Sequence, residues 1–367
     1  MDEEVATYLG QKGYTIYKDN LDIDEQLLIR KDLTVQPFVP KSSLNKPNPF
    51  PIYRESHKKF YIPKYHGYKN YGEPDIIKLG SGEKINLKFK GKLREKQVKP
   101  VDKYLKVVKN GGGGLLELHT GFGKTCLALY ILAKLKVKTI IIVHKEFLLR
   151  QWLERIEQFL PGAKVGKIQA NIIDTEGKDI VMCMLQSLSQ KEYPLDMFKE
   201  YGLTIVDECH HISAEVFSRA LFKVVTKYTL GLSATMERKD GLTKVIKMFM
   251  GDIIYTKKRE GEDNVLVKAI TYSTNDEEFN KLELNFKGQV HYSKMIKKIC
   301  EFNRRSEFIL SVLKDELEKG KEDQQIMILG HNKCLLYYLH DAIKSRNIST
   351  VGYYVGGMKE KDLKISE

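Results

Sequence analysis

The sequence is short of cysteine and of long apolar runs, and each absence excludes a class of protein. Its five cysteines are scattered and form no C-x-x-C pair, which argues against a disulfide framework and against a zinc site. No apolar run is long enough to span a bilayer, and the acidic start Met1-Asp2-Glu3-Glu4 is not followed by the apolar stretch of a signal peptide. We therefore expect a soluble, intracellular protein.

Positive charge, by contrast, is in excess. The 367 residues include 61 Lys and Arg against 48 Asp and Glu, a formal net charge of +13, and 42% of the residues are hydrophobic. This apolar content suffices for ordinary buried cores in two or three domains. The basic excess suits a polyanion such as nucleic acid, because each neutralised phosphate releases counterions, but it also fits an ordinary basic protein.

Residues 1–92 differ from the rest and predict a small β-rich accessory domain. Between Phe38 and Tyr71 the sequence is rich in proline, lysine and aromatic residues. Prolines at this density disfavour long helices, so we expect short strands and loops. We expect the aromatic side chains mainly in the core of this domain. The alternative is that they stack on bases while the lysines follow a phosphate backbone.

Residues 93–258 predict an α/β domain. Helical spacing from Leu93 to Val108 leads into four consecutive glycines, and strand-like apolar runs then alternate with amphipathic helices. The runs cover residues 115–118, 139–143, 179–184, 203–206 and 229–232. Buried runs of this length, separated by helices, indicate a doubly wound parallel sheet with helices on both faces.

The remaining residues predict a connection and the start of a second α/β unit. The charged stretch after residue 257 begins the connection, which we expect over 259–300, and the second unit covers 301–367. Its helices are expected at 302–317 and 334–345, and its strands at 325–329 and 350–355.

The strongest functional signal is the run Thr120-Gly121-Phe122-Gly123-Lys124-Thr125, which lies between a predicted strand and a predicted helix. Its glycines let backbone N–H groups face phosphate oxygens, and the helix N-terminus adds a favourable dipole. Lys124 would reach the β- and γ-phosphates of ATP, and the Thr125 hydroxyl would bind Mg²⁺. One departure is Leu118, which stands where the first glycine of G-x-x-x-x-G-K-T is usual.

A second signal is the acidic pair Asp207 and Glu208, at the end of the strand-like run 203–206. Asp207 would hold Mg²⁺, and Glu208 would act as the general base for the attacking water. One alternative is an acidic strand end that caps a helix. Another is a metal cluster with the adjoining Cys209-His210-His211, which is disfavoured because neighbouring residues of a strand point to opposite faces.

The third signal is Ser233-Ala234-Thr235, which alone would be an ordinary strand end with capping hydroxyls. In this order, however, T-G-x-G-K-T, D-E-x-H and S-A-T resemble motifs I, II and III of superfamily 2 helicases. The resemblance implies a RecA-like fold that binds ATP and Mg²⁺. It also implies a catalytic part for His210, which would couple the ATP site to Ser233-Ala234-Thr235.

Further matches extend the resemblance. The run from Leu93 to Gln97 is similar to the upstream L-R-x-x-Q element, whose glutamine reads the adenine, and this implies an ATP contact for Gln97. Two later elements resemble those that face nucleic acid in the family. They imply nucleic-acid contacts for four residues, Gln151, Trp152, Gln186 and Ser187.

The run from Ser233 to Leu242 resembles the form S/T-A-T-P-x-R-x-D-G, with Met236 in place of the proline, and it adds Arg238 to the implied nucleic-acid contacts. This form is typical of one branch of the superfamily. The branch contains the transcription and repair helicase of the xeroderma type, phage recombination helicases and large-DNA-virus transcript-release helicases. The resemblance therefore suggests a viral protein.

Helicases of this type have a second RecA-like lobe that supplies an arginine finger from a Q-x-x-G-R-x-x-R element, and this sequence does not contain that element. We therefore expect an incomplete second lobe at 301–367. The chain alone is expected to bind ATP but to turn it over slowly, with a partner chain or a longer reading frame completing the lobe.

The leading hypothesis is an ATP-dependent DNA helicase or translocase that acts on single-stranded or forked DNA, with RNA as the other substrate. The alternative is a nucleic-acid-binding regulatory subunit that has an ATP pocket but no motor activity. A third interpretation is a nuclease-associated ATPase of a restriction complex, although residues 1–92 contain no convincing nuclease cluster of carboxylates and lysine.

Overall fold

A computed structural model describes residues 6–38, 47–211, 213–237, 240–259, 266–320 and 324–358, together with Asp362 and Ser366. The chain divides into two compact units, residues 1–261 and 262–367. The finer division into an accessory domain at 1–92, an ATP-binding domain at 93–258, a connection and a partial domain from 301 stays a prediction. In the described part of the chain, no helix has the length and apolar character of a membrane span.

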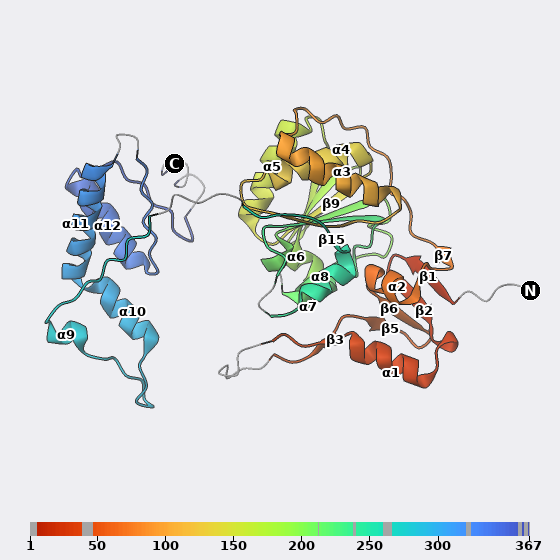
Figure 1. Cartoon of the computed structure of the whole chain (residues 1–367), viewed down its shortest axis with the longest axis horizontal. Helices are drawn as coiled ribbons and strands as arrows, with labels where there is room; N and C mark the ends of the chain where they lie inside the picture. Colours follow the sequence, from red (N-terminus) through yellow and green to blue (C-terminus); the bar gives the residue numbers. More distant parts are fainter. Residues whose placement is uncertain are drawn as a thin grey trace, which may run out of the picture. The chain divides into compact units, whose positions relative to one another are not determined.

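The N-terminal residues form a five-stranded sheet with the strand order β5-β6-β2-β1-β7 (Figure 1). Its strands are β1 (Thr7–Gly10), β2 (Gly13–Tyr17), β5 (Arg54–Glu55), β6 (Lys59–Ile62) and β7 (Ile76–Ile77). A separate pair joins β3 (Thr34–Val35) to β4 (Phe50–Pro51). The helical elements are η1 (Lys18–Asn20), α1 (Ile23–Asp32) and α2 (Lys64–Tyr71). The β-rich prediction is confirmed.

Helix α2 lies within the stretch that we expected to hold only short strands and loops, and that expectation is wrong. Pro63 stands immediately before the helix and does not interrupt it. Proline is tolerated at a helix start because the first N–H groups have no intrahelical partner.

The two faces of the N-terminal sheet differ. Strand alternation directs Tyr14, Ile16 and Phe60 into a buried core, as we expected for most aromatic residues of this part. The opposite face, called the outer face below, carries half-buried tyrosines under lysine ammonium groups. Lys59 Nζ lies 5.1 Å from the ring centre of Tyr8 and 4.4 Å from that of Tyr17.

The larger part of the first unit is an eight-stranded sheet with the order β11-β10-β12-β9-β13-β14-β8-β15. The strands are β8 (Gly114–Leu118), β9 (Thr139–Val143), β10 (Val165–Gln169), β11 (Ile172–Asp174), β12 (Ile180–Met184), β13 (Leu203–Asp207), β14 (Tyr228–Ser233) and β15 (Ile253–Lys257). All neighbours are parallel except β10 and β11. The five predicted strands are confirmed. Strands β10, β11 and β15 were not predicted.

Helices cover both faces of this sheet, so the doubly wound α/β fold is confirmed. Figure 1 shows α3 (Glu95–Lys109), α4 (Lys124–Leu135) and α5 (Glu146–Phe159) on one side. On the other side lie α6 (Leu185–Gln190), α7 (Ala214–Leu221) and α8 (Thr243–Met250). Successive residues of β9 serve the two cores, because Ile140 and Ile142 belong to one apolar cluster and Ile141 and Val143 to the other.

The second unit is helical in its described residues, with α9 (Glu277–Asn280), α10 (Tyr292–Glu301), α11 (Asn303–Lys319) and α12 (Lys333–Ser345). The two predicted helices are confirmed as α11 and α12. The strands predicted at 325–329 and 350–355 are wrong, since the structure assigns neither segment to a strand. A strand needs a neighbour to pair its backbone groups. Here Met327 and Leu329 are instead 82% and 86% exposed.

Candidate nucleotide-binding site

The predicted phosphate loop connects β8 to the first turn of α4. Gly121 and Gly123 have φ of +79° and +88°, in the left-handed region that favours glycine. A Cβ on Gly123 would lie 2.5 Å from Gln97 Nε2, so a side chain there would displace the Gln97 amide as well as strain the backbone. A Cβ on Gly121 would meet nothing within 4 Å, which shows that the loop faces open space there. The loop therefore has the backbone conformation and the open space that an anion needs.

Gln97 holds the loop from the neighbouring helix α3. Its side chain is only 2% exposed, and Nε2 donates hydrogen bonds of 3.1 Å to the carbonyl oxygens of both Phe122 and Gly123. Its Oε1 accepts from the backbone N–H of Arg94 at 2.9 Å. Both ends of the amide thus contact backbone in this structure. The adenine contact that the resemblance implies for Gln97 stays a prediction.

Lys124 and Glu208, which are 84 positions apart in the sequence, meet in an ion pair of 2.7 Å. Lys124 is the first residue of α4 and Thr125 the second, while Glu208 follows β13. Glu208 has a φ of +48°, which is uncommon for a residue with a side chain. Its Oε2 is buried without a hydrogen bond and lies 3.4 Å from His210 Nδ1.

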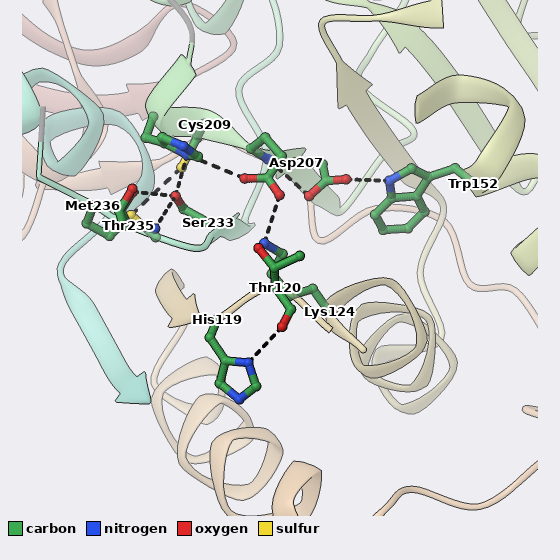
Figure 2. A network of polar contacts seen from close by, with 11 residues as sticks. His119, Thr120, Lys124, Trp152, Asp207, Cys209, Ser233, Thr235 and Met236 are labelled. Carbon is green, nitrogen blue, oxygen red and sulfur yellow. Dashed lines mark hydrogen bonds and ion pairs between the residues drawn. The ribbon is translucent and has the colours of Figure 1, made fainter. Parts of the chain in front are cut away.

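Asp207 is the last residue of β13 and is only 5% exposed. Its Oδ1 accepts from the backbone N–H of Glu208 at 3.0 Å, and its Oδ2 accepts from the indole N–H of Trp152 at 2.8 Å (Figure 2). Burial raises the pKa of the Asp207 carboxyl, and the hydrogen bond from Trp152 opposes this rise. The strand end thus presents a buried, doubly anchored carboxylate beside the phosphate loop.

A second polar chain runs from Glu208 towards the end of β14. The Ser233 hydroxyl lies 2.5 Å from His210 Nδ1 and donates to the carbonyl oxygen of Thr235, also at 2.5 Å (Figure 2). The structure therefore brings together His210 and the Ser233-Ala234-Thr235 segment, the contact that the resemblance implies.

Glu117 is a site residue that sequence reasoning missed. Its Oε1 accepts from the backbone N–H of Met236 at 2.9 Å, and its Oε2 accepts from the Thr256 hydroxyl at 3.0 Å. It joins β8, just before the phosphate loop, to the segment after β14. A single acidic residue within the apolar run of a buried strand was the available signal, since such a carboxylate needs partners.

The residues expected to contact nucleic acid have different environments. Gln151 is exposed on α5. Gln186 is also exposed, and its Nε2 donates to the carbonyl oxygen of His144 at 3.0 Å. Ser187 is buried, and its hydroxyl accepts from the backbone N–H of Ala170 at 2.9 Å. Arg238 lies outside the described residues.

The nucleic-acid contact expected of Trp152 is wrong. Trp152 has no exposed surface, and its indole N–H is bonded to Asp207. Consecutive residues of a helix lie about 100° apart, so Gln151 and Trp152 cannot share one face of α5. The prediction assigned one role to both adjacent residues. The amphipathic helix instead directs Gln151 to solvent and Trp152 into the core.

Comparison with known proteins identifies the family. Residues 90–238 match the family model described as type III restriction enzyme, res subunit. The whole chain aligns with a protein of Acanthamoeba polyphaga mimivirus that is named as an ATP-dependent RNA helicase, with 35% identity over 377 residues and 72% of that protein covered. The chain belongs to the superfamily 2 helicases, among those of large DNA viruses.

Other similarities are more partial. A protein of Sulfurisphaera tokodaii named DNA 3'-5' translocase XPB2 is 34% identical over 177 residues, which cover 47% of this chain and 38% of that protein. Among solved structures, the UvsW helicase of bacteriophage T4 is 14% identical with a TM-score of 0.48. That match covers 69% of this chain and 99% of the phage protein.

Proposed function

We propose that this protein is an ATP-dependent DNA helicase or translocase, which couples ATP hydrolysis to movement on nucleic acid. The proposal rests on one observation. Lys124, Asp207 and Glu208 lie close together beyond the carboxyl ends of β8 and β13. In doubly wound sheets this edge is where ligands bind.

The residues fit a magnesium–nucleotide complex. Gly121 faces open space, the ammonium of Lys124 can bind phosphate oxygens, and Glu208 has one buried oxygen without a hydrogen bond. The Thr125 hydroxyl and the Asp207 carboxylate are hard oxygen ligands of the kind Mg²⁺ prefers. Bound Mg²⁺ would neutralise charge that develops on the phosphates.

Glu208 is the proposed general base. A phosphate group in the loop competes with Glu208 for the ammonium of Lys124, and the carboxylate is then free to orient and deprotonate water. His210, which lies between Glu208 and Ser233, is the proposed link from this chemistry to the end of β14. Movement of that segment would transmit the state of the nucleotide.

Nucleic acid is the proposed partner. One relative is named as an RNA helicase and another as a DNA translocase, and the net charge of +13 favours a polyanion. We favour single-stranded or forked DNA, and RNA is the other substrate to test. We also propose that the tyrosine and lysine side chains on the outer face of the N-terminal sheet add to this binding, by stacking on bases and by pairing with phosphates.

The second candidate function is a nucleic-acid-binding regulatory subunit that has an ATP pocket but no motor activity of its own. Lys124, Asp207 and Glu208 count against it, because a pocket without hydrolysis does not need all three. Slow ATP turnover by this chain alone stays a prediction.

The deciding experiment measures ATPase activity of the chain with and without single-stranded DNA or RNA. We expect slow ATP turnover that nucleic acid stimulates and that Lys124→Ala abolishes. Lys134→Ala is the matched control, because Lys134 is an exposed lysine on the same helix. Full activity in Lys124→Ala would disprove the assigned pocket. ATP binding without hydrolysis, with or without nucleic acid, would favour the regulatory subunit.

A further inference from the structure

Trp152 is the single tryptophan of the chain, and it is fully buried on α5. Its ring belongs to the apolar core between the helices α3 to α5 and the eight-stranded sheet. A buried indole N–H needs a hydrogen-bond acceptor, and here the acceptor is a carboxylate oxygen, Asp207 Oδ2, at 2.8 Å (Figure 2). An indole that donates to a buried carboxylate costs more to replace than an ordinary core aromatic residue.

This hydrogen bond is one of two that hold the carboxylate of Asp207. The bond to Oδ1 comes from the adjoining backbone N–H of Glu208, and so it moves with the strand end itself. Among the hydrogen bonds given for the described residues, the bond from Trp152 is the one that reaches Asp207 from a helix, 55 positions away in the sequence. The two bonds together define the plane of the carboxylate and thus the direction of its remaining lone pairs.

We propose that Trp152 is a positioning residue for metal binding. Its indole N–H holds the Asp207 carboxylate in the orientation that binds the Mg²⁺ of a magnesium–nucleotide complex. This inference rests on the proposed function, in which Asp207 is the metal-binding carboxylate. Nucleotide without metal contacts the phosphate loop and Lys124, so its binding does not depend on Trp152.

The test compares Trp152→Phe with the wild type by titrating a fluorescent ATP analogue, once with Mg²⁺ and once with EDTA. Phenylalanine keeps an aromatic ring in the core but removes the N–H. We expect the Mg²⁺ concentration for half-maximal analogue binding to rise at least about tenfold, as for other residues that orient metal ligands. The affinity measured in EDTA should stay within about twofold of the wild type.

Tyr104→Phe is the matched control. Tyr104 is also a fully buried aromatic residue of the same apolar cluster, and its hydroxyl donates one hydrogen bond of 2.8 Å to the carbonyl oxygen of Thr229. This variant loses one buried hydrogen bond without touching Asp207, so its Mg²⁺ requirement should match the wild type. An equal rise in both variants would overturn the proposal, because it would reflect a loosened core.

A second measurement does not depend on the folding of a variant. Because all tryptophan emission comes from Trp152, the wild type itself reports on the contact with Asp207. We expect nucleotide with Mg²⁺ to change this emission, and nucleotide with EDTA to leave it unaltered. Identical spectra under the two conditions would overturn the positioning role. If the wild type binds no nucleotide under either condition, the proposed function itself fails.

Discussion

At the scale of single residues, the ion pair between Lys124 and Glu208 is the contact on which the proposed chemistry depends. The two groups are mostly buried and lie 2.7 Å apart, and Glu208 holds a left-handed backbone conformation. Conformations of this kind cost free energy and occur often at functional sites. In the proposed function a phosphate group competes for the same ammonium, so we expect binding of ATP to release the Glu208 carboxylate.

Glu208→Gln should separate binding from hydrolysis. The amide retains the size of the side chain but cannot accept a proton from water. We expect nucleotide affinity within a few-fold of the wild type and a loss of turnover of about 100-fold or more. Equilibrium binding of a fluorescent ATP analogue and steady-state phosphate release measure the two quantities. Lys124→Ala, which we expect to lose both, is the comparison, and wild-type turnover in Glu208→Gln would contradict the role of Glu208 as the base.

At the scale of elements, the phosphate loop is held from two sides. Helix α3 contributes Gln97, whose amide bonds the carbonyl oxygens of Phe122 and Gly123, and strand β15 accepts a hydrogen bond from the backbone N–H of His119 through the carbonyl of Lys257 at 3.2 Å. The loop is therefore shaped before a nucleotide arrives, which lowers the ordering cost of binding.

Gln97→Leu tests whether this residue holds the loop or reads the base. Loss of the two hydrogen bonds to the loop, each contributing about 1 kcal/mol, should weaken ATP and GTP binding alike, by about 30-fold. Val98→Ala, at the exposed neighbouring position on α3, is the control and should change neither affinity. A loss confined to ATP would instead assign Gln97 to adenine recognition. Competition of the two nucleotides against a fluorescent analogue gives both affinities.

The outer face of the N-terminal sheet provides a prediction for nucleic acid. Lys12, Lys59 and Lys78 lie 4.3–5.1 Å from the ring centres of Tyr8 and Tyr61. Replacing all three lysines by alanine should weaken binding of single-stranded DNA about tenfold at 0.1 M salt. The negative slope of log K against log salt should become shallower by about 2, since each phosphate contact contributes about 0.7.

The control for this triple variant has the same change in charge at another place. Lys99, Lys106 and Lys109 are exposed on α3, and their replacement by alanine also removes three positive charges. Fluorescence anisotropy with a labelled oligonucleotide measures both variants. Equal weakening in the two would show that only net charge matters and that the sheet face is no specific site.

At the scale of the whole molecule, the N-terminal part and the eight-stranded domain share one interface within the first unit. Helix α2 contributes Lys64, which is 5% exposed and whose ammonium donates to the carbonyl oxygen of Lys227 at 2.6 Å. Next to it, the Tyr65 hydroxyl lies 2.6 Å from the Thr229 hydroxyl. Burial lowers the pKa of Lys64 from its ordinary value of 10.5 to about 7.

This lowered pKa predicts stability that rises with pH. Between pH 7 and 10.5 the unfolded chain binds a proton at Lys64 that the folded chain has released, so the free energy of unfolding increases over this window. The contribution is at most about 1.4 kcal/mol per pH unit. Lys64→Met, which cannot titrate, should be more stable than the wild type at pH 7, and the difference should shrink by pH 10. Urea unfolding at both pH values measures it, and a constant difference would contradict the prediction.

The amino-acid sequence by itself determined the features that depend on local pattern. Apolar runs identified five strands of the larger sheet, and the glycines of the loop specified left-handed backbone next to a helix start. The order of the three motifs was enough to predict the family. Short or mixed strands such as β10, whose residues alternate between half-buried and buried positions, gave too weak a signal.

Tertiary structure decided everything that requires two distant segments to meet. Strand order brought Lys124 to Glu208 and Trp152 to Asp207, and pairing determined which segments are strands, so the isolated runs at 325–329 and 350–355 are not. Trp152 illustrates the difference. Its neighbour Gln151 and its place in a motif suggested a surface contact, but helix geometry and the cost of burying an unbonded N–H directed its indole to the carboxylate of Asp207.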